Sequence, residues 1–358
     1  MRSISTIDHQ QVTDLTRTLG RRLMVTPESI YPFMDFDDLM PELLKLVTHR
    51  CDRIIGGGHL SPDILIAADR ANLHLHEVLS VSPFSLDCDN IASQVTSPKD
   101  IIYISNPNRA TGANVGLADL RHLLEQIPDG ILIVDEYYYD YYGITAIPLL
   151  QQFSNVVILR SFAASFGVGS AEAGFVVASP TIIEHLAELC NNRAITATKF
   201  RVLATTLEND QALNSRLRLL HDEMLRVSTI LTRQGIQNRI TAADFLLIRV
   251  ADITAAGNQL AKHKVQFDNL DGYPQLKGYL RYKVQSESSN DLLINAFAKM
   301  PLEHYRIAGV DLRVTTLKRP TEVVVEDPVI HHVGTRHPVP ESSAKANRKG
   351  SRPTQVTR

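Results

Sequence analysis

Short apolar runs alternate with amphipathic segments along the first 180 residues. The runs that we predict as strands lie at 62–69, 77–84, 101–105, 131–136, 155–162 and 174–179. Apolar residues at helical spacing predict helices at 38–50 and 117–127, and 147–153 is a weaker helix candidate. This alternation predicts an α/β fold, with a mostly parallel sheet and helices on both of its faces.

The pattern changes after residue 180. Long helical patterns at 181–190 and 213–234 are followed by short strands and helices over 240–300, which predict a small α+β domain. The predicted divisions are an N-terminal arm at 1–35, a large domain at 36–205, a small domain at 206–300 and a C-terminal extension at 301–358. The extension is polar and basic from about residue 338, and we expect it to be disordered there.

Composition and charge exclude several classes of protein. Apolar residues make up 44% and charged residues 21%, and the formal net charge is −2, so we expect no bulk attraction to nucleic acid or to a membrane. No apolar run is long enough to span a bilayer and the N-terminus has no apolar signal region, so we expect a cytoplasmic protein. Cys51, Cys88 and Cys190 form no metal-binding spacing, and the tail histidines of HHVGTRH lack an acidic partner, so no metal is expected.

Polar residues stand where several of the predicted strands end. Asn106 follows the run 101–105, Asp135 lies at the end of the run 131–136, and Ser161 lies at the end of the run 155–162. Ligands of parallel sheets bind outside the carboxyl ends of the strands. We therefore expect Asn106 and Asp135 to lie at adjacent strand ends and to face one cleft.

Three linked motifs resemble those of a known family. The segments ISNPNRATG, LIVDEYYYDY and VVILRSFAASFGVGSAEAGFVVAS are similar in order and spacing to NPNNPTG, DEAYYEF and RTFSKAFGLAGLRIGY of histidinol-phosphate aminotransferases. The likeness extends from about residue 60 to residue 300. It implies the fold-type I architecture of class I and II aminotransferases and pyridoxal phosphate as the cofactor.

The resemblance also implies roles for individual residues. Asp135 would pair with the protonated pyridine nitrogen of the cofactor, which keeps the ring an electron sink. Asn106 and Tyr138 would donate hydrogen bonds to the phenolic oxygen, and Ser161 would contact the phosphate. Arg281 would bind the carboxylate of an amino-acid-like small molecule. A homodimer is implied as well, with the N-terminal arm crossing to the partner.

This sequence departs from the family pattern at four places. Ala164 stands where the family has its Schiff-base lysine, and Glu172 stands where the family has an arginine that helps to hold the phosphate. The glycines at 56–58 lie only about fifty residues before Asn106, and we expect no helix directly after them. The small-domain arginine of the family falls near Phe267.

These departures predict a catalytically degenerate aminotransferase-like protein, with no catalytic residue at position 164 and with weak or lost cofactor binding. Alanine can neither form an imine nor move a proton. One alternative is an active pyridoxal- or pyridoxamine-phosphate enzyme in which another group, such as Lys199, moves the proton. A second alternative is a partner- or nucleic-acid-binding protein that acts through the basic tail, although the tail has no interleaved aromatic residue to stack on bases.

Overall fold

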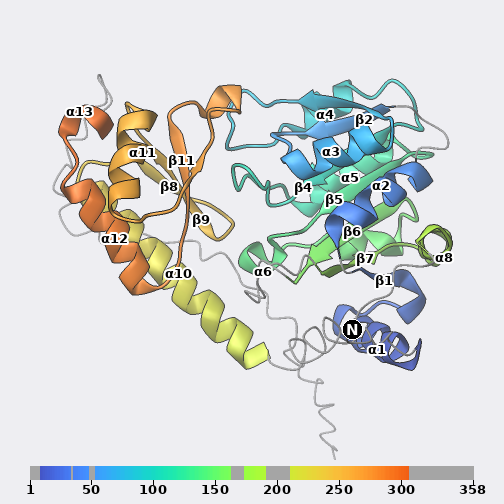
Figure 1. The fold of residues 1–358 in the computed structure, drawn as a ribbon. Coiled ribbons are helices and arrows are strands. Elements are labelled where there is room, and N and C mark those ends of the chain that lie inside the picture. Colours follow the sequence, from blue (N-terminus) through green and yellow to red (C-terminus); the bar gives the residue numbers. More distant parts are fainter. Residues whose placement is uncertain (1–8, 34, 48–52, 163–172, 191–209, 306–358) are drawn as a thin grey trace, which may run out of the picture.

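A computed structural model describes residues 9–33, 35–47, 53–162, 173–190 and 210–305 of the chain. Two sheets are present, a large one in the first half of the chain and a small one in the second (Figure 1). The predicted boundary near residue 205 and the extension beyond residue 305 lie outside the described residues. The domain limits therefore stay predictions.

The large sheet has seven strands in the order β1-β7-β6-β5-β4-β2-β3. Their bounds are β1 Ile30–Phe33, β2 Arg53–Gly57, β3 His74–Val78, β4 Ile101–Ser105, β5 Ile131–Asp135, β6 Val156–Ser161 and β7 Gly174–Val177. Strands β3, β2, β4, β5 and β6 pair in parallel, whereas β7 is antiparallel to both β6 and β1. The prediction of a mostly parallel sheet is confirmed.

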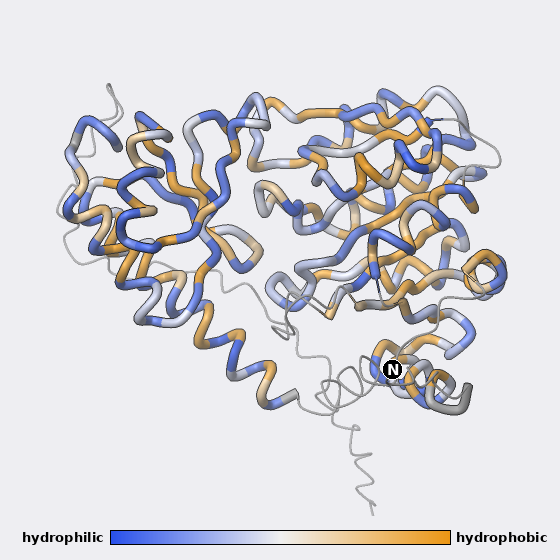
Figure 2. Tube along the Cα trace, in the orientation of Figure 1, coloured by the Kyte–Doolittle hydropathy of each residue, from blue (hydrophilic) through white to orange (hydrophobic). Residues whose placement is uncertain are grey.

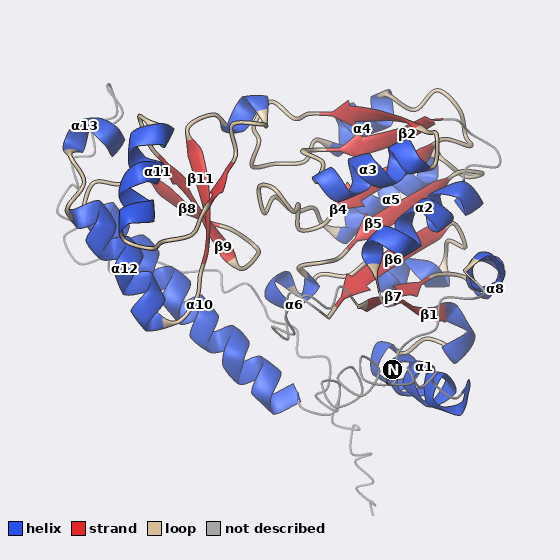
Figure 3. Cartoon of the chain, in the orientation of Figure 1, coloured by secondary structure: helices blue, strands red, loops and turns tan. Residues whose placement is uncertain are grey.

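Helices cover both faces of this sheet (Figure 3). On one face the core includes residues of α1 (His9–Leu23), α4 (Cys88–Ser93) and α5 (Leu117–Gln126). On the other face it includes residues of α2 (Phe36–Val47), α3 (Pro62–Arg70) and α8 (Pro180–Leu189). Alternate strand residues supply the two cores, because successive side chains of a strand point to opposite faces. Tyr103 and Ile133 belong to the second core, and Ile104 and Val134 to the first.

The predicted strand at 62–69 is wrong, because these residues form helix α3. Pro62 occupies its first turn after the N-cap residue Ser61, and its buried residues Ile64, Ala67 and Ala68 follow helical spacing. The strand lies earlier, in β2, which includes Gly56 and Gly57. The expectation that no helix follows these glycines is also wrong.

The described part of the segment expected as an arm packs against the sheet of its own chain. Leu15 and Leu19 of α1 are buried in the core of the large domain. Strand β1 extends the sheet by pairing with β7. A short 3₁₀ helix, Pro27–Ser29, connects α1 to β1.

The second sheet has four antiparallel strands in the order β10-β11-β9-β8. Their bounds are β8 Asn238–Ile240, β9 Phe245–Arg249, β10 Asp268–Asn269 and β11 Tyr279–Lys283. The helices of this part are α10 Asp210–Arg233, α11 Ile253–Lys262, α12 Glu287–Ala298 and α13 Leu302–Tyr305, with a 3₁₀ helix at Pro274–Leu276. Their apolar residues form a core of their own, and apolar and polar positions alternate along these elements in Figure 2. This arrangement is the expected small α+β unit.

Segments of the two parts meet close to the carboxyl ends of β3 and β5. Gln275 donates a hydrogen bond to the carbonyl of Ser80 (2.9 Å), and the rings of Tyr138 and Phe245 lie 5.8 Å apart. Helix α6 (Tyr139–Tyr142) and a 3₁₀ helix (Ile147–Gln151) follow β5. None of the helices in the described ranges is long and apolar enough to cross a membrane.

Candidate functional site

Asn106 and Asp135 lie at adjacent strand ends, as predicted. Asp135 is opposite Ser105 in the β4–β5 register, and the backbone N–H of Asn106 donates to the carbonyl of Asp135 (2.9 Å). The hydrogen-bond partners of the two buried side chains belong to different cores of the sheet. The Asn106 amide exchanges two hydrogen bonds with the backbone of Val115, in the core on one face of the sheet. The Asp135 carboxylate accepts from the hydroxyl of Tyr103 (2.8 Å), which lies in the core on the other face.

The carboxylate of Asp135 forms an ion pair with Arg109, which was not among the predicted site residues. Arg109 Nε lies 2.8 Å from Asp135 Oδ2, the same oxygen that accepts from Tyr103. The other oxygen, Oδ1, accepts from the backbone N–H of Tyr137 (3.1 Å). Arg109 also reaches Asp63 in the first turn of α3, at 3.1 Å. The acid at the end of β5 is therefore neutralised from within the chain.

Arg109 itself is nearly buried, with 13% of its side chain exposed. Its guanidinium carbon lies over the rings of Phe36 and Tyr137, at 4.7 Å and 4.2 Å from their centroids. Burial is the largest single influence and disfavours the charged form, but the charge and hydrogen bond of Asp135, together with the nearby Tyr103 and Tyr137, raise the pKa of Arg109 above its ordinary value. The sequence did contain a signal, since Arg109 in NPNRATG departs from the motif NPNNPTG on which the resemblance rests.

The loop that carries Arg109 is held by Asn108. The Asn108 side-chain oxygen accepts from the backbone N–H groups of Ala110 and Thr111 (3.1 Å each), and its amide donates to the carbonyl of His59 (2.8 Å). Asn108 is completely buried. An Asx-type turn of this kind fixes the backbone on both sides of Arg109.

Tyr138 and Arg281 approach this region from different elements. Tyr138 is 9% exposed and lies against Tyr137 at a ring distance of 4.8 Å. Burial, and next the charge of Asp244, raise its pKa well above the ordinary value. Arg281 of β11 pairs with Asp268 (2.9 Å) and donates to the backbone carbonyl of Arg109 (2.8 Å). Arg281, which was expected to bind a substrate carboxylate, thus supports the loop that carries Arg109.

The remaining predicted positions are less informative. Ser161 ends β6 and lies opposite Gly174 of β7. Phe267 packs against the core of the small domain, in contact distance of Gly257. Ala164, Glu172 and Lys199 lie outside the described residues.

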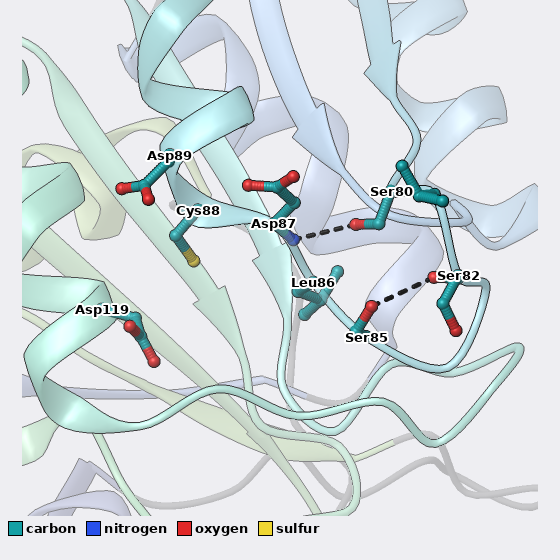
Figure 4. A pocket seen from close by; sticks show the side chains of 9 residues that line it. Ser80, Ser82, Ser85, Leu86, Asp87, Cys88, Asp89 and Asp119 are labelled. Carbon is teal, nitrogen blue, oxygen red and sulfur yellow. Dashed lines mark hydrogen bonds between the residues drawn. The ribbon is translucent and has the colours of Figure 1, made fainter.

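A hollow of about 410 Å³ lies elsewhere, between the loop after β3 and the start of α5 (Figure 4). Three carboxylates and Cys88 line it, but two of the carboxylates are helix caps: Asp87 accepts from Asn90 N–H and Asp119 from Gly116 N–H. Burial, and next the nearby carboxylates, raise the pKa of the Cys88 thiol to about 12, so a reactive thiolate is not formed near neutral pH. Among the described residues, no group of His, Cys, Asp or Glu could hold a metal ion.

Comparison with known proteins gives the class of the molecule. The family profile described as aminotransferase class I and II matches residues 65–295. This is more than half of the chain, and the chain belongs to that family.

Individual relatives agree with the motif resemblance. The chain is 23% identical over 291 residues to the histidinol-phosphate aminotransferase of Caldanaerobacter subterraneus subsp. tengcongensis, covering 80% of this chain and 82% of the relative. The crystal structure of histidinol-phosphate aminotransferase from Sinorhizobium meliloti, in complex with pyridoxal-5'-phosphate, superposes with a TM-score of 0.73 at 17% identity, covering 83% of each chain. L-threonine-O-3-phosphate decarboxylase from Porphyromonas gingivalis superposes with a TM-score of 0.67 at 19% identity, covering 80% and 90%. Since that fold also carries a decarboxylase, it does not define the reaction.

The described residues do not fit a pyridine nitrogen at Asp135 unless Arg109 is displaced. Asp135 Oδ2 accepts hydrogen bonds from Arg109 and Tyr103, and the charge of Arg109 at 2.8 Å would repel a second cation at this carboxylate. The amide of Asn106 and the guanidinium of Arg281 also have partners within the chain. No catalytic step through the cofactor is therefore derived from this arrangement.

Proposed function

We propose that this chain is an aminotransferase-like protein that does not transaminate. The observation that carries the proposal is Ala164, at the position of the family's Schiff-base lysine. Transamination requires a group that removes a proton from the substrate Cα and returns it on the same side of the cofactor. A methyl side chain does neither, and no lysine lies between Lys99 and Lys199 to replace it.

Weak binding of pyridoxal phosphate is the second part of the proposal. Glu172 replaces a phosphate-binding arginine with a carboxylate, which repels a phosphate dianion. The ion pair of Asp135 with Arg109 supports the same conclusion from the ring side of the site. Ser161 and Tyr138 are the remaining candidates for contacts with the cofactor.

In the cell we propose a binding or regulatory role for a homodimer, with an amino-acid-like small molecule as the ligand of the degenerate site. Leu65 and Ile66 on α3 are about half exposed, at 47% and 50%, and offer apolar surface close to that site. Light scattering at micromolar concentration should give about 80 kDa, twice the 39.9 kDa of one chain. A mass of one chain would contradict the dimer.

The proposal is tested with the purified protein, saturating pyridoxal phosphate and a panel of amino donors that includes histidinol phosphate. We expect no keto acid or aldehyde product above the background of a protein-free control. Ordinary enzymes turn over at about 1–1000 s⁻¹, so activity in that range would overturn the proposal and direct attention to a lysine elsewhere in the chain.

A further inference from the structure

We infer that Arg109 is a built-in counter-cation, which takes the position at Asp135 that the resemblance gives to the cofactor's ring nitrogen. The chain would thus close part of its cofactor site with one of its own side chains. This inference deepens the proposed function and rests on it, because a closed ring site matters only in a protein that no longer transaminates. It concerns residues that the structure describes, whereas the proposed function rests on Ala164.

The first argument is charge. The side chain of Asp135 is 2% exposed, and a carboxylate so buried requires a cation or several donors. Arg109 supplies the cation at 2.8 Å, with Tyr103 and the N–H of Tyr137 as further donors. Oδ1 accepts only from the N–H of Tyr137 and could take a further donor, but a protonated ring nitrogen there would lie beside the charge of Arg109. The two cations would repel one another at this carboxylate.

The second argument is shape. A guanidinium is flat, and that of Arg109 lies over the rings of Phe36 and Tyr137. A protonated pyridine ring is also a flat cation that can lie against aromatic rings. The surroundings that favour Arg109 would therefore favour such a ring if the side chain were absent.

The third argument is anchoring. Arg109 is held by groups on three elements: Asp135 of β5, Asp63 of α3 and, through its backbone carbonyl, Arg281 of β11. Asn108 fixes the loop on its other side. So many contacts hold the side chain in place, and a ligand that merely competes with it faces all of them at once.

The test uses pyridoxine, which has the same ring but neither the aldehyde nor the phosphate. The missing lysine and Glu172 are therefore irrelevant to its binding. We compare the full chain with the variant Arg109→Asn and with the double variant Arg109→Asn, Asp135→Asn. The double variant keeps the vacated space and removes the charge.

We expect pyridoxine to bind the single variant at least tenfold more tightly than it binds the wild type or the double variant, by calorimetric titration. Methylguanidinium at millimolar concentration should raise the unfolding temperature of the single variant and leave the double variant unchanged. Equal pyridoxine affinity of the wild type and the single variant would overturn the inference, as would equal affinity of the two variants.

A second measurement covers the case in which Arg109→Asn does not fold. In wild-type protein labelled with ¹⁵N-arginine, the Nε–H of Arg109 should exchange slowly with water at pH 7, because it is buried and bonded to Asp135. Arg109→Lys assigns the signal, and Asp135→Asn should accelerate its exchange at least tenfold. Fast exchange in the wild type, or exchange unaffected by Asp135→Asn, would show that the pair does not hold the site closed.

The two proposals fail in different ways. Turnover by the wild type would overturn the proposed function. Pyridoxine binding that does not depend on Arg109 would overturn only the present inference.

Discussion

Asp135 and Glu136 are consecutive residues at the end of β5, and each forms an ion pair with an arginine. Glu136 pairs with Arg160 at 2.9 Å and also accepts from the backbone N–H of Ala146. Arg160 belongs to β6, the neighbouring strand, whereas Arg109 belongs to the loop after β4. The Glu136–Arg160 pair is therefore positioned by the hydrogen bonds of the sheet, and the Asp135–Arg109 pair by the conformation of a loop.

The two ion pairs differ in role: one stabilises the sheet and the other belongs to the candidate site. Glu136 is completely buried, and burial raises its pKa although Arg160 lowers it. Its arginine lies over Tyr139 of α6, so the pair ties together three elements next to the sheet. The pair at Asp135 can be changed by a single exchange in a loop, such as arginine for asparagine at position 109, without altering the strands. We therefore interpret the Glu136 pair as structural and the Asp135 pair as the variable part of the ligand site.

The largest loss of stability is expected when the Glu136–Arg160 pair is broken. Arg160→Met leaves Glu136 buried and without its cation, which should reduce the free energy of unfolding by about 3–5 kcal/mol. The matched variant is Asp135→Asn, which leaves Arg109 paired with the partly exposed Asp63 and should cost about 1–3 kcal/mol. Urea unfolding followed by circular dichroism measures both. An equal or larger loss in Asp135→Asn would contradict the assignment of the two pairs.

The elements that the sequence predicted correctly have strong internal patterns. The apolar runs of β4, β5 and β6 are buried on both faces, and α5 and α10 have regular apolar spacing, so local sequence is sufficient for them. Strand β2 was missed because Gly56 and Gly57 resemble a turn. A Cβ at Gly57 would approach the Cδ1 atoms of Ile104 and Ile91 to 2.4 Å and 2.6 Å, so this glycine reflects close packing and not a bend.

Only the part of the site that stands out in the local sequence could be predicted. Asp135 was identified because a polar residue that ends an apolar run stands out. Arg109 was overlooked although it departs from the NPNNPTG motif, because that departure does not reveal its partner, which is 26 positions away. The hydrogen bonds of Asn106 to Val115 and of Arg281 to the Arg109 backbone depend on tertiary structure, and the sequence could not predict them.

A second prediction concerns Gly112, in the loop that carries Arg109. Gly112 has a φ of +67°, and a Cβ there would approach Thr241 Cβ to 2.4 Å. Gly112→Ala should therefore combine left-handed strain with a clash against the small domain, and reduce stability by about 2–4 kcal/mol. Gly143 is the control, because its φ is +81° but nothing lies within 4 Å of the added Cβ. Gly143→Ala should cost about 1 kcal/mol.

The same two variants test whether the loop conformation positions the Asp135–Arg109 pair. Displacement of the loop by Gly112→Ala should accelerate exchange of the Arg109 Nε–H, whereas Gly143→Ala should not. Unaltered exchange in Gly112→Ala would indicate that the loop conformation does not position Arg109, and the contrast between loop-based and strand-based pairs would be lost.

The smallest expected effect concerns His59, whose backbone carbonyl accepts from Asn108 and so supports the loop. The His59 side chain is 3% exposed and lies 5.3 Å from the ring of Tyr273. Burial lowers its pKa below the ordinary value, although the nearby carboxylate of Glu77 opposes this. The folded state therefore keeps His59 neutral at a pH where the unfolded chain already protonates it.

The sign of the pH dependence follows from this difference. Below about pH 6.5 the unfolded state binds a proton that the folded state does not, so stability falls as the pH falls, by at most about 1.4 kcal/mol per pH unit from this group. His59→Phe removes the titration but keeps a ring beside Tyr273 and the backbone bond to Asn108. Between pH 7 and pH 5 the unfolding free energy of the wild type should therefore decrease more than that of the variant. Parallel profiles would mean that His59 is protonated equally in both states, and the support it gives the loop would then be independent of pH.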